Sequence, residues 1–167
     1  RTYNYDMQLI DAYRENRNKI ESAKRNFVIF HLLGQHTIYG ERYPKEFTMF
    51  DGSNVKSHLP LNNEQRSMVA DYLNATLYND YIVESIIHMF SDRNAIVIYF
   101  SDHGDEVYNF RMQQGRTDMK TDDPRAMRNQ LDIPFLIYVS PRYAASHQHT
   151  VEQIRKSVDR PFMTDNL

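Results

Sequence analysis

The chain has 167 residues and no cysteine, and its 20 Lys and Arg residues nearly balance its 22 Asp and Glu residues. This length suffices for one ordinary domain with a buried core. The formal net charge of −2 argues against a nucleic-acid partner, because domains that bind nucleic acid usually carry a basic excess. The absence of cysteine excludes disulfides, thiolate metal ligands and a cysteine nucleophile. The longest apolar runs, 27–30 and 96–100, are too short to span a bilayer, and the first residues do not form a signal peptide.

The first third of the chain predicts a helix, a strand and a long loop. Residues 5–23 form an amphipathic helical pattern in which Leu9, Ile10 and Tyr13 recur on one side. Residues 27–33 form a continuous β-branched and aromatic run, which is typical of a strand covered on both faces. We interpret His31, inside this run, as a buried histidine of the core. Residues 37–63 lack periodicity, and loops of that length are usually functional or disordered.

The remainder predicts a second helix followed by two more buried strands. Asn62 is a suitable N-cap with Gln65 three residues further on, so a helix is expected from there to about Phe90. Apolar runs at 95–100 and 133–139 predict strands, separated by a polar stretch. A short final helix is expected near 151–157.

Alternation of buried strands with amphipathic helices indicates an α/β fold with a mainly parallel sheet. Ligands of such sheets bind beyond the carboxyl ends of the strands. The segments that follow the three apolar runs are 34–36, 101–106 and 140–142. We therefore expect the functional residues among these segments, at one edge of the sheet. No internal repeat or domain boundary is visible, so a single domain is predicted.

Asp102 and His103 are the strongest local signal, because they are adjacent at the point where a predicted strand ends. A carboxylate oxygen and a neutral imidazole nitrogen together suit Zn²⁺, or Mn²⁺ in a site richer in oxygen. Gly104 would let the backbone turn sharply, so that both side chains could converge on one ion. The alternative is a plain strand end, since Asp and Gly favour turns and a histidine can cap them.

His36 follows the first predicted strand and is expected at the same edge of the sheet as Asp102 and His103. A histidine at this place can bind a metal or hold an anionic oxygen. Taken alone, His36 is equally compatible with an ordinary surface residue. The coincidence of the two strand ends on one edge favours the functional interpretation.

Several segments together resemble a known family. They occur in order and at matching spacing, at 30–36, 41–44, 79–83, 99–105 and 133–137. This pattern closely resembles the catalytic domain of the phosphoethanolamine transferases, which belong to the sulfatase/alkaline-phosphatase superfamily. The Asp-His-Gly element is shared by the wider superfamily, whereas Gly-x-His and Arg-Tyr-Pro point to the transferase branch. The resemblance implies a three-layer α/β/α alkaline-phosphatase-like fold, with residues 1–167 as the C-terminal portion of a single catalytic domain.

The resemblance also implies roles for individual residues. Asp102 and His103 match two ligands of a catalytic Zn²⁺, with Mn²⁺ or another divalent metal also compatible. His36 matches a catalytic histidine that contacts the phosphoryl group or an additional zinc. The family's other ligands, a Glu and the nucleophilic Thr, would precede Arg1. A further family histidine after the Asp-His pair is replaced here by a Gln-Gln-Gly-Arg segment, whose Arg116 could bind the phosphate instead.

The activity implied by the resemblance is phosphoethanolamine transfer from phosphatidylethanolamine to lipid A or the lipopolysaccharide core, through a covalent phospho-threonine intermediate. The implied partners are a phospholipid donor and a glycolipid acceptor, with no nucleic acid. A preceding segment would anchor the protein in the bacterial inner membrane, with the catalytic domain facing the periplasm, and the 167-residue chain alone would show little turnover. The acceptor and the oligomeric state stay open. Alternatives are a sulfatase or phosphoglycerol transferase of the same superfamily, or a non-catalytic binding module that retains the fold.

Overall fold

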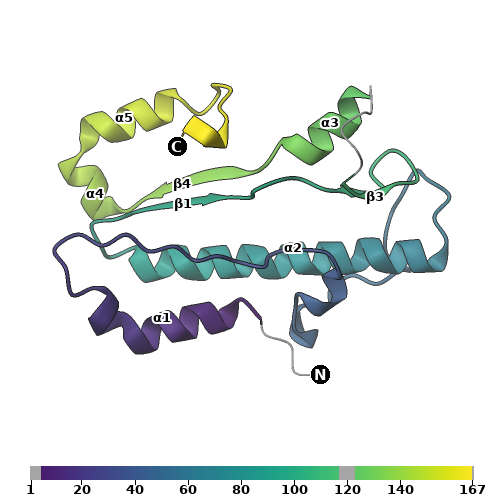
Figure 1. Cartoon of the computed structure of the whole chain (residues 1–167), viewed down its shortest axis with the longest axis horizontal. Helices are drawn as coiled ribbons and strands as arrows, with labels where there is room; N and C mark the ends of the chain where they lie inside the picture. The colour runs from purple at the N-terminus through teal and green to yellow at the C-terminus, as the bar shows by residue number, and fades with distance from the viewer. Residues whose placement is uncertain (1–4, 117–122, 167) are drawn as a thin grey trace.

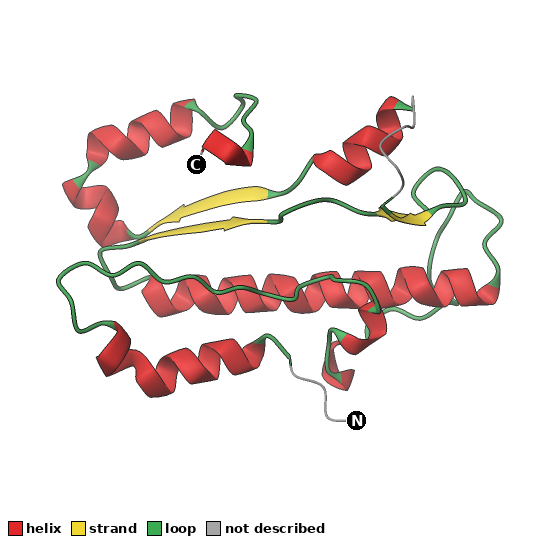
Figure 2. Cartoon of the chain, in the orientation of Figure 1, coloured by secondary structure: helices red, strands yellow, loops and turns green. Residues whose placement is uncertain are grey.

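The computed structural model describes residues 5–116 and 123–166 (Figure 1). Its elements are α1 (Met7–Ile20), η1 (Tyr39–Glu41), η2 (Lys45–Phe47), α2 (Asn63–Phe90), β1 (Ile96–Phe100), β2 (Glu106–Val107), β3 (Gln114–Gly115), α3 (Pro124–Leu131), β4 (Phe135–Val139), α4 (Pro141–Ser146), α5 (Gln148–Lys156) and η3 (Thr164–Asn166). Figure 2 shows β1 and β4 between α1 and α2 on one side and α4 and α5 on the other. Within the described ranges, no helix combines the length and the apolar character needed to cross a bilayer.

The long helix α2 confirms the prediction made from its first residues. The Asn62 side chain accepts a hydrogen bond from the Gln65 backbone N–H at 2.9 Å, and the Gln65 side chain accepts one from the Asn62 N–H at 2.9 Å. This reciprocal capping box satisfies two of the amide groups that a helix start leaves unpaired. The helix then continues to Phe90, as expected.

The core lies where α1 crosses α2, which confirms the amphipathic helix predicted at 5–23. Ile10 of α1 is completely buried with Tyr78, Ile82 and Ile86 of α2. Side chains from the extended segment 27–33 and from β1 pack against the same cluster. Burial of this apolar surface fixes both helices against the strand region.

Both described strand pairs are antiparallel, whereas the sequence predicted a mainly parallel sheet. Ile96 of β1 pairs with Val139 of β4, and Phe100 pairs with Phe135. β4 thus begins beside the end of β1 and runs back along it. The segment 140–142 therefore lies at the opposite end from Asp102, and its Ser140 caps α4.

The segment 27–33 is extended, but it is not the strand covered on both faces that the sequence predicted. Phe30 and Leu32 pack against the core, whereas Phe27 is 90% exposed and Ile29 is 74% exposed. No described strand pairs with the segment, and helices cover only its inner side. His31 is therefore exposed, and its interpretation as a buried core histidine is wrong.

Asn74 of α2 orders the loop that precedes this helix. Its side-chain oxygen accepts hydrogen bonds from the backbone N–H groups of Met49 and Phe50, each at 2.9 Å. Its amide donates to the Tyr43 hydroxyl at 3.1 Å and to the Phe50 carbonyl at 2.9 Å. Asn74 is completely buried, so all of its hydrogen-bonding capacity is used inside the protein.

Short elements also occur where the sequence predicted only polar loop. The stretch 105–130 contains β2, β3 and all but the last residue of α3, and the final helix is preceded by α4. Asp123 caps α3 by accepting a 2.9 Å hydrogen bond from the Arg125 backbone N–H. Its carboxylate also binds the Arg125 guanidinium, and these contacts lower the pKa of Asp123 to about 2. A proline at the first helical position assists this start.

Candidate active site

Two chain segments direct candidate site residues toward the same end of the molecule. The extended segment 27–33 and β1 run in the same direction over α2 (Figure 1). His36 follows the first segment, and Asp102 and His103 follow β1. The structure thus places His36 after one of these segments and Asp102 and His103 after the other, and the two segments run in the same direction.

The turn before His36 is held by a buried carboxylate. Asp6 is 7% exposed, and it accepts hydrogen bonds from the backbone N–H groups of Leu33 at 2.9 Å and Gly34 at 2.8 Å. Gly34 has a φ of 51°, and an added Cβ would lie 3.2 Å from the Asn79 side-chain oxygen. The positive φ favours glycine here, and an added Cβ would also crowd the Asn79 side chain.

The imidazole of His36 is exposed beyond this turn. Its Nδ1 lies 3.4 Å from the Thr37 hydroxyl. Arg42 donates to the His36 carbonyl at 3.1 Å and to the Thr37 carbonyl at 2.9 Å. The backbone that carries His36 is therefore fixed from two sides, while its side chain stays accessible to a ligand.

Asp102 and His103 present free donor atoms. The Asp102 side chain is 88% exposed, and its Oδ1 lies 3.8 Å from Nε2 of His103. Nδ1 of His103 lies 2.8 Å from the Gly104 carbonyl oxygen. A carbonyl only accepts hydrogen bonds, so this contact assigns the proton of the neutral ring to Nδ1 and leaves the Nε2 lone pair free. A backbone carbonyl on the remote nitrogen is the usual support of a metal-binding histidine.

Gly104 has a different role from the sharp turn that the sequence suggested. Its N–H donates to the Gln130 carbonyl at 2.9 Å, and an added Cβ would lie only 2.2 Å from the Asn129 carbonyl oxygen. The position therefore requires glycine because the end of α3 passes directly against it. Through this contact, α3 fixes the backbone immediately after His103.

The pair fits part of a zinc site. Zinc is held in proteins by three or four ligands at about 2.0–2.2 Å for nitrogen and oxygen. A carboxylate oxygen and an unprotonated imidazole nitrogen 3.8 Å apart are the right types of donor, and a small side-chain rotation would bring both onto one ion. Among residues 5–116 and 123–166 no group of three or more potential ligands occurs. Asp102 and His103 offer two donors of a suitable type, fewer than the three or four that a zinc site needs.

The β2–β3 hairpin brings Arg116 back toward this pair. Glu106 pairs with Gly115, so the next residue, Arg116, comes level with Asp105. Arg116 is exposed, and Asp105 is two residues from His103. The hairpin thus brings the cationic residue Arg116 level with Asp105, shortly after Asp102 and His103 in the chain.

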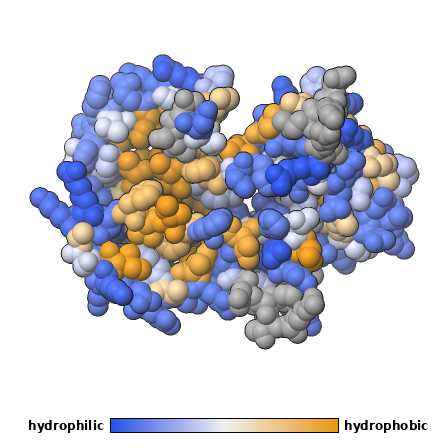
Figure 3. Space-filling model, in the orientation of Figure 1, coloured by the Kyte–Doolittle hydropathy of each residue, from blue (hydrophilic) through white to orange (hydrophobic). Residues whose placement is uncertain are grey.

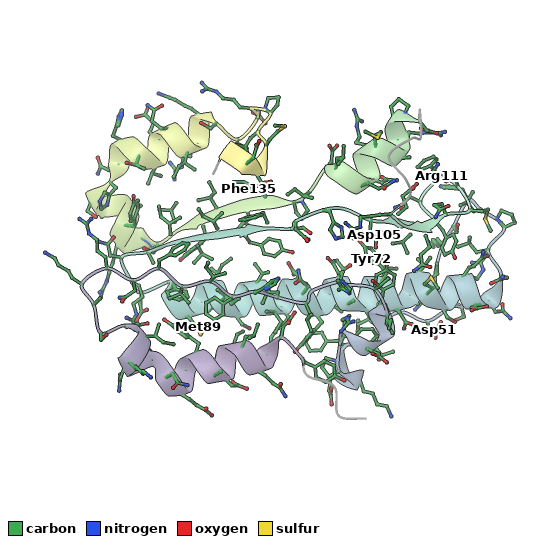
Figure 4. All side chains as sticks on the ribbon, in the orientation of Figure 1. Asp51, Tyr72, Met89, Asp105, Arg111 and Phe135 are labelled. Atoms are coloured by element: carbon green, nitrogen blue, oxygen red, sulfur yellow. The ribbon has the colours of Figure 1, made fainter. Side chains whose placement is uncertain are left out.

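Two acids, Asp105 and Glu106, anchor the hairpin. Tyr39 donates to Asp105 Oδ2 at 2.7 Å, and burial followed by this contact raises the pKa of Tyr39, so its hydroxyl stays protonated. Glu106 is 1% exposed and binds the guanidinium of Arg111 and the side-chain amide of Gln130. Figure 4 shows Asp105 and Tyr72 facing each other between the hairpin and α2.

Asp6 and Tyr39 contribute to this region without any local signal in the sequence. Asp6 binds a turn 27 and 28 residues away, and Tyr39 binds an acid 66 residues away. Such partners become evident only after the chain has folded.

Comparison with known proteins defines the class of this fold. A family model described as Sulfatase matches residues 1–161. The chain belongs to the sulfatase family, and the predicted alkaline-phosphatase-like α/β class is confirmed. The periplasmic domain of EptC from Escherichia coli, solved in complex with Zn, superposes with a TM-score of 0.77 at 37% identity, over 88% of this chain and 40% of that domain. The soluble domain of lipooligosaccharide phosphoethanolamine transferase A from Neisseria meningitidis has the same fold, with a TM-score of 0.65, 24% identity and coverage of 95% of this chain and 47% of that one.

The curated relatives are named phosphoethanolamine transferases, which confirms the resemblance seen in the sequence. EptC from E. coli strain K12 is 38% identical over 169 residues, covering 98% of this chain and 27% of the relative. CptA from Salmonella typhimurium is 38% identical over 153 residues, covering 88% of this chain and 25% of the relative. The chain thus spans about a quarter of the length of these relatives.

Proposed function

We propose that this chain forms part of a zinc-dependent phosphoethanolamine transferase that moves phosphoethanolamine from phosphatidylethanolamine to lipid A or the lipopolysaccharide core. The observation that carries the proposal is the Asp102–His103 pair, whose Nδ1–carbonyl contact leaves Nε2 available to a metal. The identity of 38% to EptC across almost the whole chain supports the same reaction class. The protein would act at the bacterial inner membrane with this domain in the periplasm.

The residues have distinct roles in this proposal. Asp102 and His103 would hold a divalent metal, which supplies positive charge to the transferred phosphoryl group. His36, with its ring exposed beyond the Asp6 turn, would contact a phosphoryl oxygen or give a proton to the leaving group. Arg116, exposed at the end of β3, would neutralise negative charge on the phosphate. A threonine in a segment preceding Arg1 would carry the phosphoethanolamine between donor and acceptor.

Replacement of the matching quarter of E. coli EptC by this chain tests the proposal. The chimaera should transfer phosphoethanolamine to lipopolysaccharide in a strain without EptC, as measured by mass spectrometry of the lipid. Asp102→Ala and His103→Ala should each lower transfer and zinc affinity at least about 100-fold, since even residues that only support metal ligands are worth about 10–100-fold in affinity or activity.

Exposed residues of the same types provide the controls. His88 lies in the last turn of α2 and its side chain is 72% exposed, and Asp92 follows the end of this helix with a side chain that is 78% exposed. Asp92→Ala and His88→Ala should each leave transfer unchanged. Normal transfer by the Asp102 and His103 variants would refute the metal-ligand assignment. A folded chimaera without transfer activity would favour the non-catalytic module, and turnover of a sulfate ester or of phosphoglycerol would favour the other superfamily activities.

A further inference from the structure

Tyr39 is turned into the protein three residues after the exposed His36. Ile38, which is 64% exposed, has a φ of 67°, a left-handed conformation that a β-branched residue rarely adopts. η1 begins directly after this residue, and Tyr39 is only 2% exposed. Strained backbone of this kind persists only where its surroundings hold it, and it is concentrated at functional sites. The contacts of Tyr39 therefore stabilise the turn that follows His36.

Both the ring and the hydroxyl of Tyr39 contact the chain that follows His103. The ring shares a buried cluster with Val107 of β2 and packs edge-on against Tyr72 of α2, with ring centroids 5.2 Å apart. The hydroxyl donates to Asp105 Oδ2 at 2.7 Å. Tyr39 thus joins the η1 segment to the start of the β2–β3 hairpin across 66 residues of sequence.

The hydrogen bond from Tyr39 is the support of a carboxylate that is otherwise poorly satisfied. Within the part of the chain that the structure describes, Oδ1 of Asp105 is buried and accepts no hydrogen bond, whereas Oδ2 accepts the one from Tyr39. Hydrogen bonds from a hydroxyl to a carboxylate are shorter and stronger than those between neutral groups. The contact is therefore suited to hold two segments together.

The segment that contains Tyr39 is also bound to the backbone of His36. The Arg42 N–H donates to the Tyr39 carbonyl at 2.9 Å. The Arg42 guanidinium donates to the His36 carbonyl at 3.1 Å and to the Thr37 carbonyl at 2.9 Å. These contacts close residues 36–42 into one unit, so a shift of Tyr39 would move the backbone that carries His36.

Short stretches of backbone lead from this contact to the candidate site residues. Consecutive Cα atoms are about 3.8 Å apart, so the Cα of His36 lies within about 11 Å of that of Tyr39, and the Cα of His103 within about 8 Å of that of Asp105. Figure 3 shows mainly hydrophilic side chains in the right half of the view, where Figure 1 places the hairpin, and apolar ones gathered in the left half. The polar half of this face suits a charged phosphate ester.

We propose that Tyr39 is a positioning residue of the phosphoryl-transfer site. Its hydroxyl, bound to Asp105, fixes the segment that carries His36 relative to the metal-ligand candidates. Tyr39 acts through these segments and touches neither substrate nor metal, and a misplacement of about 1 Å in such a site can cost about 100-fold in rate. The effect on rate rests on the proposed transferase function, whereas the coupling of the two segments does not.

Steady-state kinetics test this role in the chimaera in which the chain replaces the matching quarter of E. coli EptC. Tyr39→Phe removes the hydroxyl and keeps the ring against Tyr72. We expect kcat to fall at least about tenfold while KM for phosphatidylethanolamine stays unchanged, the pattern of an interaction that acts on the transition state. Tyr13→Phe is the matched control, because it also removes a buried hydroxyl bound to a carboxylate, that of Glu21, and it should leave kcat unchanged. Equal kcat for the two variants would overturn the proposal.

Variants of Asp105 separate the hydrogen bond from the negative charge. Asp105→Asn keeps an oxygen that can accept from Tyr39 and should retain most of the transfer rate, whereas Asp105→Ala should lose at least as much as Tyr39→Phe. The double variant Tyr39→Phe/Asp105→Ala should be no slower than Asp105→Ala alone, since both changes remove one shared interaction. Equal losses in Asp105→Asn and Asp105→Ala would show that the charge acts in its own right and would refute a role through Tyr39.

Amide hydrogen exchange in the same chimaera measures the coupling without reference to activity. The Arg42 amide is bound by Tyr39 itself, and the Gly104 amide by Gln130. Tyr39→Phe should speed exchange at both amides at least about threefold, the effect of one lost hydrogen bond on a local opening equilibrium, and Tyr13→Phe should not. Faster exchange in a chimaera that transfers nothing would support the coupling and refute only the proposed function. Unchanged exchange at either amide would overturn the coupling and the proposal with it.

Discussion

Gly104 shows how a single residue couples a metal-ligand candidate to the rest of the fold. It follows His103 directly, its carbonyl orients the imidazole, and its amide is bound by the end of α3. The absence of a side chain lets the Asn129 carbonyl approach within a distance that a Cβ could not tolerate. The backbone directly after His103 is thus held by a helix that begins twenty-one residues after His103, at Pro124.

We expect Gly104→Ala to lower the free energy of unfolding by about 1–3 kcal/mol, the usual cost of overpacking, because the new methyl would meet a backbone oxygen. Urea denaturation measures the change. Gly52→Ala is the matched control, since its nearest neighbour is the movable Ser67 hydroxyl at 3.3 Å, and it should change stability by less than about 1 kcal/mol. Equal stability of the two variants would contradict the close approach at Gly104.

At the scale of elements, α2 organises its surroundings by polar as well as apolar contacts. Ile82 and Ile86 bind α1 and the strand region, whereas Asn74 holds the loop around Met49 and Phe50. A buried amide that makes every hydrogen bond it can make specifies one arrangement of the loop. The same loop contains Tyr43, so its order extends toward the segment that carries His36.

Asn74→Ala should lower the free energy of unfolding by about 2–4 kcal/mol, since it leaves the Phe50 N–H without its acceptor and the Phe50 carbonyl without its donor, whereas the Met49 N–H keeps the Phe47 carbonyl at 3.0 Å. The loop amides should also exchange hydrogen faster. Asn16→Ala, on the exposed face of α1, removes one solvent-exposed hydrogen bond and should change stability by less than about 0.5 kcal/mol. Similar losses in both variants would show that the Asn74 network adds no stability.

Two tyrosines that are buried or partly buried and paired with carboxylates make the whole molecule sensitive to alkaline pH. Burial, followed by the contact with Glu21, raises the pKa of Tyr13 to about 12. Burial and the contact with Asp71 raise the pKa of Tyr43 to about 12 as well. In the unfolded chain these phenols ionise near pH 10, so the folded state holds their protons more tightly.

The stability provided by these tyrosines is complete below about pH 10 and is lost as the pH rises through about 12, because the unfolded chain releases the protons first. Tyrosinate absorbance and far-ultraviolet circular dichroism, followed over this range, should show a late ionisation that coincides with unfolding. Tyr13→Phe should reduce the loss of stability over the same range. Ionisation of every tyrosine near pH 10 in a folded protein would contradict the expectation.

The sequence by itself determined those features that depend on neighbouring residues. The periodicity and capping box predicted α1 and α2, and the apolar runs predicted β1 and β4. The order and spacing of the motifs identified the family and selected Asp102, His103, His36 and Arg116. These features are local, because helical spacing, caps and strand propensity act within a few residues.

Only the tertiary structure decided the features that depend on distant parts of the chain. It made β4 antiparallel to β1, and it left the segment 27–33 unpaired with His31 exposed. It also assigned Asp6 to the turn before His36 and brought α3 against Gly104. Strand direction and long-range hydrogen bonds follow from where the chain returns in space, and a linear pattern of apolar residues does not contain that information.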